Sequence, residues 1–230
     1  MKNISLISSR KIRQLIIEEL DEDSRNIPRE LKRRSLQETC DFISENMPYV
    51  PFNFRNQIEI LQFAIKKAKI DGLWIEFGIY KGQTVNLIAK KSNKLIYGFD
   101  AFEGLPETWR ADYRKGAFKI NRLPKYHKNV VLVKGFFEDT IPLFIKSHPE
   151  PISFIHIDCD LYSSTKTIFD NFEKQITTGT IICFDEYFNY PGWKNGEFKA
   201  FGEFIERTGK KFEYLGYVYR HSQVVVRITS

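Results

Sequence analysis

The sequence predicts an α/β fold, in which a mostly parallel sheet carries helices on both faces and its last strand runs antiparallel. From residue 73 onward, short apolar runs alternate with amphipathic stretches of helical period. The two final apolar runs, 212–219 and 223–228, are separated by too few residues for a crossover, so they must pair antiparallel. Acidic residues and glycines follow the apolar runs directly, at the sheet edge where open α/β folds bind ligands.

The composition excludes several classes of protein. The 230 residues are 42% hydrophobic with a net charge of +6, so the chain is neither disordered nor short of core material. No apolar run reaches the length of a membrane-spanning helix, about 18 residues. Residues 1–5 lack the apolar region of a secretion signal, and the three cysteines share no metal-ligand spacing. We therefore expect a reduced, cytoplasmic protein with no membrane partner.

Residues 1–70 are predicted to form a helical segment that precedes a sheet domain of residues 71–230. Apolar residues recur at helical spacing in 10–20, 36–45 and 56–69, and a charged stretch separates the first two helices. Pro48 and Pro51 end the second helix, because proline cannot continue one. We expect this segment to act as a lid or as an oligomer contact, and we favour a homodimer.

The sheet domain is predicted to contain seven strands, each a short apolar run. In chain order they are residues 73–77, 94–99, 130–134, 152–157, 180–184, 212–219 and 223–228. Amphipathic helices at 84–91, 139–147, 163–175 and 197–207 fill the longer connections. Pro142 is compatible with the second of these helices because proline is tolerated near a first helical turn.

The first two strand ends favour a nucleotide-like ligand. Gly78 and Gly82 let the backbone approach a ligand closely, and the helix that follows offers free N–H groups. The turn lacks both the Lys-Ser/Thr ending of a phosphate-binding loop and the G-x-G-x-x-G dinucleotide pattern. Asp100 ends the second strand at a spacing where an acid can accept hydrogen bonds from ribose hydroxyls. An ordinary strand-to-helix turn and a simple helix cap are the alternatives.

Four carboxylates follow the fourth and fifth strands. They are Asp158, Asp160, Asp185 and Glu186. Carboxylates gathered at neighbouring strand ends repel one another unless a cation joins them. Oxygen-rich clusters suit Mg²⁺ or Mn²⁺ better than zinc, so the sequence predicts a divalent metal site. His156, within the fourth strand, is expected to be a core residue rather than a catalytic one.

The basic charge is concentrated in one internal segment. Residues 109–134 contain eight Lys and Arg residues against Asp112 alone, a net charge of +7. Two interpretations stay open for this segment: a solvated loop, or a patch that binds an anion such as a phosphate or a carboxylate.

Together these motifs resemble the macrocin O-methyltransferase (TylF/MycF-like) family of class I S-adenosylmethionine-dependent methyltransferases. The matching segments are 76–82, 99–106, 134–140, 156–162 and 184–187, and the likeness extends from about residue 70 to residue 229. The resemblance implies a Rossmann-like seven-stranded sheet. It also implies magnesium-dependent methylation of a hydroxyl on a sugar or glycan precursor, with loss of activity on chelation. The basic segment suggests an anionic acceptor, such as a nucleotide-linked or phosphorylated sugar.

The resemblance also implies roles for individual residues. The cofactor would be held by Glu76, Gly78, Gly82, Thr84, Asp100, Phe102, Phe137, Glu138 and Asp158. Metal ligands would be Asp158, Asp185 and Glu186, although the family usually has Asp-Asp at the last two positions. Asp160 is favoured over Asp158 as the base that accepts the hydroxyl proton. Acceptor contacts would come from Trp109, Arg110, Arg114, Tyr187 and Trp193.

Two other functions are alternatives to this one. An RNA-modifying methyltransferase is favoured by the isoelectric point near 9.1. It is opposed by the balanced charge outside 109–134 and by the lack of any recognisable RNA-binding module, so no nucleic acid partner is expected. A binding protein that has lost the reaction is opposed by the intact carboxylates at both strand ends.

Overall fold

The computed structural model describes residues 9–50 and 53–230. Residues 1–5 and Pro51, on which two of the expectations above depend, lie outside the described residues. The strands form one sheet of order β1-β7-β8-β6-β5-β2-β3-β4. Their bounds are β1 Asn53–Phe54, β2 Leu73–Phe77, β3 Ile96–Asp100, β4 Val130–Lys134, β5 Ile152–Ile157, β6 Ile181–Phe184, β7 Phe212–Val218 and β8 Val224–Ile228. Only β8 runs antiparallel to its neighbours, which confirms the predicted mostly parallel sheet.

The two-residue strand β1 was not predicted. It pairs parallel with β7 at the sheet edge, where Asn53 lies opposite Tyr217 and Phe54 opposite Val218. Two residues are too short to show a period of apolar residues, so no sequence pattern identifies this strand. All seven predicted strands are present, with ends displaced by at most two residues.

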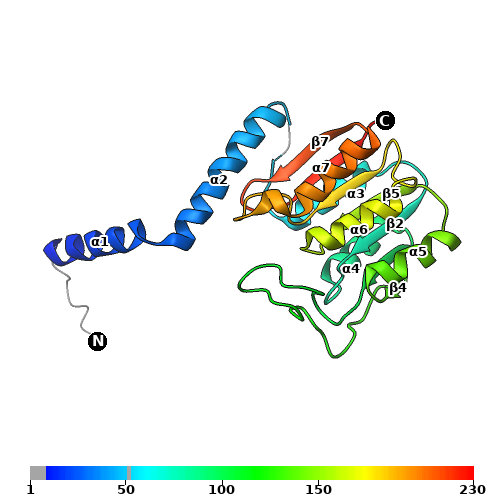
Figure 1. Ribbon diagram of the computed structural model, residues 1–230, viewed down its shortest axis with the longest axis horizontal. Helices are drawn as coiled ribbons and strands as arrows, with labels where there is room; N and C mark the ends of the chain where they lie inside the picture. Colours follow the sequence, from blue (N-terminus) through cyan, green and yellow to red (C-terminus); the bar gives the residue numbers. More distant parts are fainter. Residues whose placement is uncertain (1–8, 51–52) are drawn as a thin grey trace.

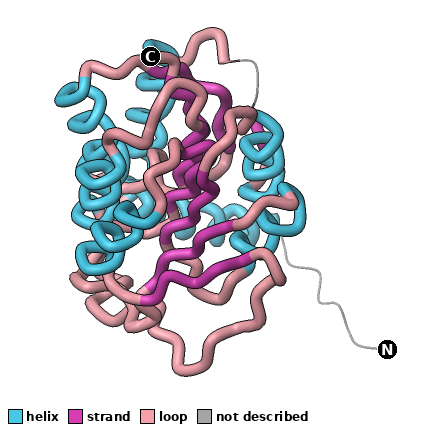
Figure 2. Tube along the Cα trace, turned by 90° about the vertical axis from the view of Figure 1, so that its right-hand side faces the viewer, coloured by secondary structure: helices cyan, strands magenta, loops and turns pink. Residues whose placement is uncertain are grey.

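Helices cover both faces of the sheet, as Figure 2 shows. α5 (Phe137–Ser147), α6 (Tyr162–Phe172) and α7 (Glu197–Thr208) pack on one face, and α3 (Gln57–Lys67) and α4 (Gln83–Ser92) pack on the other. Successive residues of a strand point to opposite faces. In β2, accordingly, Ile75 and Phe77 join the cluster with α5 to α7, whereas Trp74 joins the cluster with α3 and α4.

α1 and the start of α2 extend away from the sheet, as Figure 1 shows. α1 (Ser9–Ser24) buries none of its residues. α2 (Ile27–Asn46) is longer than predicted and includes much of the charged stretch. The Asn26 side chain caps it by accepting a hydrogen bond from the Arg29 N–H at 3.0 Å, and Pro28 lies in its first turn. Both are helix-start signals, and they outweigh the lack of apolar residues there.

The C-terminal half of α2 and the whole of α3 pack against the sheet domain. The Phe42 ring lies against Trp193 and Phe198, and the Asn189 N–H donates to the Thr39 hydroxyl at 3.0 Å. α3 buries four apolar residues, Ile60, Leu61, Ala64 and Ile65, in the core beneath the sheet. Within residues 1–70, therefore, α3 packs against the sheet, whereas α1 buries no residue against it. No described helix has the length and apolar content to cross a bilayer.

The order in which strands are added to the sheet changes direction between β2 and β5. β3 and β4 lie on one side of β2, and β5 and β6 lie on the other. The loops that follow β2 and β5 therefore start side by side and separate, which opens a crevice at the carboxyl edge. Gly78 has a φ of +84°, and a Cβ added to it would lie 1.8 Å from the Asp158 carbonyl oxygen. Only glycine allows the two loops to approach this closely.

Candidate active site

A cavity of about 520 Å³ lies at the carboxyl ends of the parallel strands. Ten of the residues assigned to the site from sequence line it. These are Gly78, Thr84, Asp100, Trp109, Arg110, Phe137, Glu138, Asp158, Asp160 and Glu186. The loops after β2, β3, β4, β5 and β6 all contribute to its wall. Residues predicted to bind a ligand at separate strand ends thus line the same cavity.

Other residues assigned from sequence lie outside this lining. Gly82, Phe102 and Arg114 do not face the cavity. Tyr187 and Trp193, expected to contact the acceptor, are 1% exposed and belong to the aromatic core around Phe42. That expectation for Tyr187 and Trp193 does not match their position. The loop after β6 turns its large rings inward because they complete the packing between α2 and α7.

Asp100 presents a fixed carboxylate to the cavity. Its Oδ2 accepts a hydrogen bond from the Tyr80 N–H at 2.8 Å, and its Oδ1 accepts one from the Phe102 N–H at 2.7 Å. Burial raises the pKa of Asp100, and the backbone N–H groups that it accepts from oppose the rise. Two oxygens oriented in this way can each accept a further hydrogen bond from a ligand hydroxyl.

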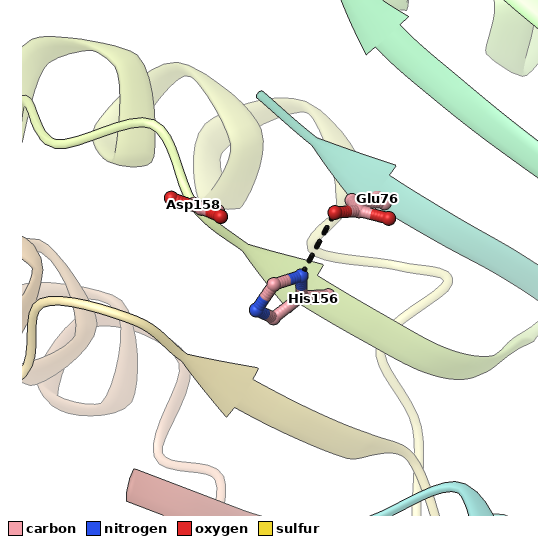
Figure 3. A group of neighbouring side chains, drawn as sticks. All are labelled: Glu76, His156 and Asp158. Atoms are coloured by element: carbon pink, nitrogen blue, oxygen red, sulfur yellow. Dashed lines mark hydrogen bonds and ion pairs between the residues drawn. The ribbon is translucent and has the colours of Figure 1, made fainter. Parts of the chain in front are cut away.

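Glu76 does not line the cavity. Its carboxylate forms a buried pair with His156, as Figure 3 shows. Both side chains are fully buried on neighbouring strands, and His156 Nδ1 lies 3.1 Å from Glu76 Oε1. The Thr84 hydroxyl donates to the same oxygen at 2.5 Å and itself lines the cavity. Glu76 Oε2 is buried without a partner among the described residues. His156 is thus the core residue that the sequence predicts, and its ring helps to orient Glu76.

The carboxylates form a tight cluster beside the cavity. Asp158, Asp185 and Glu186 offer oxygens that all lie within 4.8 Å of one another. Burial and then the charge of Asp185 raise the pKa values of Asp158 and Glu186 well above their usual range. Glu186 Oε2 is buried without a partner among the described residues. Clustered carboxylates with unpartnered oxygens match the donor set that Mg²⁺ prefers.

Glu197 is a fifth carboxylate at this site, beside the four predicted from sequence. No sequence pattern identified it. It is fully buried at the start of α7, and its Oε2 accepts a hydrogen bond from the Glu186 N–H at 3.1 Å. Burial and the charge of Asp185 raise its pKa well above the usual range. An acid in the first turn of an amphipathic helix is common, so its position gave no signal of a role in the site.

Two amides hold Asp185 in place. Gln57 Nε2, from the first turn of α3, donates to Asp185 Oδ1 at 2.5 Å, and Gln223 Nε2 donates to the same oxygen at 3.0 Å. Neither glutamine was identified from sequence, because they lie 128 and 38 residues from Asp185 along the chain. Because both amides donate to Oδ1, together they fix the orientation of the carboxylate.

Asp160 lies where the cavity meets the carboxylates. Burial and the charge of Asp185 raise its pKa to about 7, and the charge of Arg110 opposes the rise. A carboxyl group with such a pKa can accept a proton near neutral pH. Its φ of +62° is rare for a residue with a side chain, and Tyr80 and Phe118, which also line the cavity, share this left-handed region. Strained backbone of this kind is often found at functional sites.

An arginine on an aromatic platform closes one side of the cavity. The Arg110 guanidinium lies 3.8 Å from the centre of the Trp109 ring and 4.9 Å from that of Tyr113. All three residues line the cavity. Stacking on the two rings fixes a cation at the mouth, where it can meet an anionic group of a ligand.

Comparisons with known proteins find similarity to methyltransferases. A family model described as a methyltransferase domain matches residues 75–187. The fold is similar to that of the calicheamicin methyltransferase CalS11, with a TM-score of 0.61 and 22% identity over 88% of this chain and 93% of that one. It is also similar to the O-methyltransferase NovP, with a TM-score of 0.59 and 17% identity over 76% and 80% of the two chains. A search of curated protein sequences found no match.

A second, apo structure of CalS11 carries a more specific description. It is named a TDP-rhamnose 3'-O-methyltransferase of calicheamicin biosynthesis, and it matches with a TM-score of 0.56 and 21% identity over 86% of this chain and 93% of that one. The segment matched by the family model runs from within β2 to the residue after Glu186, so it includes the Gly78 turn, Asp100 and four of the carboxylates, but not Glu197.

Proposed function

We propose that this chain is an S-adenosylmethionine-dependent methyltransferase that transfers a methyl group to a hydroxyl oxygen of a sugar or glycan precursor. One observation carries the proposal: Asp100 and the carboxylates Asp158, Asp160 and Glu186 line one cavity, where the loops after β2 and β5 meet at the close contact of Gly78 with Asp158. Asp100 could therefore bind the nucleoside of the cofactor while the carboxylates bind a metal ion beside the acceptor in the same cavity. The names of CalS11 and NovP, and the resemblance to the macrocin O-methyltransferase group, support the choice of a sugar hydroxyl.

The residues present fit the cofactor. Asp100 would accept the two ribose hydroxyls, and the Gly78 turn would allow the cofactor's methionine end to approach the backbone. Glu76 would act through Thr84, and its unpartnered Oε2 could accept from a cationic group. Phe137 and Glu138, from the start of α5, would contact the adenine.

The carboxylates would hold a divalent cation, Mg²⁺ by the chemistry of the donors. Asp158, Asp185 and Glu186 are the ligands that we propose, with Gln57 and Gln223 orienting Asp185. Glu186 in place of a shorter aspartate is compatible, because its oxygens already lie within the cluster. When bound, Mg²⁺ would lower the pKa of the acceptor hydroxyl, and S-adenosylmethionine would supply a methyl group on its sulfonium.

Asp160 would accept the hydroxyl proton as the oxygen–carbon bond forms and the carbon–sulfur bond breaks. Its pKa near 7 suits this role, and it lines the same cavity as Asp100. The platform of Trp109 and Tyr113 would hold the acceptor so that its oxygen lies in line with the methyl carbon, because positioning supplies much of the acceleration in such a transfer.

Cofactor binding tests the proposal most directly. Titration calorimetry with S-adenosylhomocysteine should show binding to the wild type, and Asp100→Asn should weaken it by at least about tenfold, because the amide replaces one of two charged acceptors. Glu103→Gln is the matched control, since Glu103 is exposed three residues away and pairs with Lys119 instead. Absence of binding by the wild type would refute the proposed reaction.

The acceptor is proposed to be anionic. Replacing Arg110 by Gln should raise the KM for a nucleotide-linked sugar such as TDP-rhamnose by about tenfold or more, because a charge-assisted contact is lost. Arg114→Gln is the control, because Arg114 is exposed in the same loop and does not line the cavity. S-adenosylhomocysteine affinity should stay constant in both variants. Equal KM values in the two variants would contradict an anionic contact at Arg110.

A further inference from the structure

α1 carries an apolar stripe that nothing in the described chain covers. Ile12, Leu15, Ile16 and Leu20 recur at helical spacing, and their side chains are 45% to 61% exposed. With Glu19 these residues line a shallow groove along the helix. Figure 1 shows the helix lying well away from the sheet, at the end of α2. A contiguous exposed apolar stripe on an isolated helix indicates a binding surface.

The charges of α1 are divided along its length. Its first half carries the basic residues Arg10, Lys11 and Arg13, and its second half carries the acidic residues Glu18, Glu19, Asp21, Glu22 and Asp23. Asp21 and Asp23 already pair with Arg25 and Arg29. Arg13, Glu19 and Glu22 form no ion pair within residues 9–50 and 53–230.

This division makes the helix complementary to an inverted copy of itself. In an antiparallel pair, the basic end of each helix meets the acidic end of the other, whereas a parallel pair would place like charges together. The stripe is also nearly symmetric about Ile16, so Ile12 of one copy would face Leu20 of the second. A twofold axis through the centre of the stripe satisfies both conditions.

We propose that α1 is a homodimerisation helix that pairs antiparallel with α1 of a second copy of this chain. A membrane surface fits less well, because helices that lie on anionic lipid carry an excess of Lys and Arg, whereas the acidic residues of α1 outnumber the basic ones. A single pair of 16-residue helices is a small interface, so we expect the dimer to dissociate on dilution. The proposal does not depend on the reaction.

Charge reversal in the full-length protein tests the pairing mode. Arg10→Glu/Arg13→Glu leaves Lys11 as the one basic residue of α1, and Glu19→Arg/Glu22→Arg replaces two of the five acidic residues in its second half. In sedimentation velocity, we expect a concentration-dependent dimer for the wild type, monomers for each double variant alone, and dimers in an equimolar mixture of the two. Glu and Arg both favour helices, so the helix itself should persist.

Two further measurements test the apolar contact and the antiparallel orientation of the helices separately. Ile16→Lys should give a monomer, whereas Ile17→Lys, one residue away and outside the groove, should remain dimeric. In a Cys40→Ser background, Ile12→Cys mixed with Leu20→Cys should form a crossed disulfide more readily than either variant alone. Homotypic disulfides, dimerisation of each charge variant alone, or a wild type that is monomeric at every concentration would overturn the proposal. A monomer that binds anionic phospholipid vesicles would assign the stripe to a membrane instead.

Discussion

Replacing Gly78 by Ala is expected to weaken cofactor binding strongly and to destabilise the protein more than any comparable glycine substitution. The added Cβ would lie 1.8 Å from the Asp158 carbonyl oxygen, so the backbone of one loop or both must move. Because Gly78 belongs to the proposed cofactor turn and Asp158 to the carboxylate cluster, a single displacement disturbs both. We expect S-adenosylhomocysteine affinity to fall by about a hundredfold or more, a misplacement effect of the size known for catalytic sites.

Gly116 supplies a closely matched control. It has the same φ of +84°, but a Cβ added there would meet nothing within 4 Å. Gly116→Ala should therefore show only the conformational cost of a left-handed alanine, about 1 kcal/mol. Thermal denaturation and calorimetry of the two variants separate the steric contact from that cost. Equal losses of stability and of affinity would show that the contact between the loops is unimportant.

Asp160→Asn is expected to lower kcat strongly while cofactor binding is retained. The amide cannot accept the hydroxyl proton, and loss of a general base costs about 10²- to 10⁴-fold in rate. Asp160 lies beside the carboxylates rather than at the Asp100 end, so S-adenosylhomocysteine affinity should change little. The measurement is kcat with TDP-rhamnose, or with whichever nucleotide-linked sugar is methylated, at saturating Mg²⁺.

Asp112→Asn controls for loss of an acidic charge near the cavity mouth, since Asp112 is exposed between Arg110 and Tyr113. Its kcat should match that of the wild type. Calorimetry with Mg²⁺ should give similar heats for all three proteins, because Asp160 is not among the proposed ligands. An unchanged kcat in Asp160→Asn would reject Asp160 as the base and leave Asp158 as the remaining candidate.

Residues at strand ends could be placed from sequence because the topology of a parallel sheet brings those ends to one edge. That rule predicted that Asp100 and the carboxylates after β5 and β6 would share a site, and the cavity contains Asp100, Asp158, Asp160 and Glu186. Gln57, Gln223 and Glu197 could not be found in this way. Each reaches the cluster through tertiary packing of a distant element, and no local pattern marks that.

α1 and α2 also have features that local sequence patterns predict and features that they do not. Helical period predicted the existence of α1 and α2, but the start of α2 at Ile27 depended on a cap and a proline within a charged stretch. The expected acceptor contacts of the aromatic residues after β6 differ from their observed positions for another reason. Aromatic rings suit a sugar platform and a core equally well, and only the position of Phe42 shows that Tyr187 and Trp193 serve the core.

The left-handed backbone around the cavity limits how far this protein could be stabilised without loss of function. Tyr80, Phe118 and Asp160 each hold a conformation that glycine would adopt at lower cost. Glycine at these positions would relieve local strain, but it would also remove the side chains that line the cavity and loosen its loops. A search for thermostable variants should therefore leave these three positions unchanged and concentrate on the outer surfaces of the helices, where stability and activity do not compete.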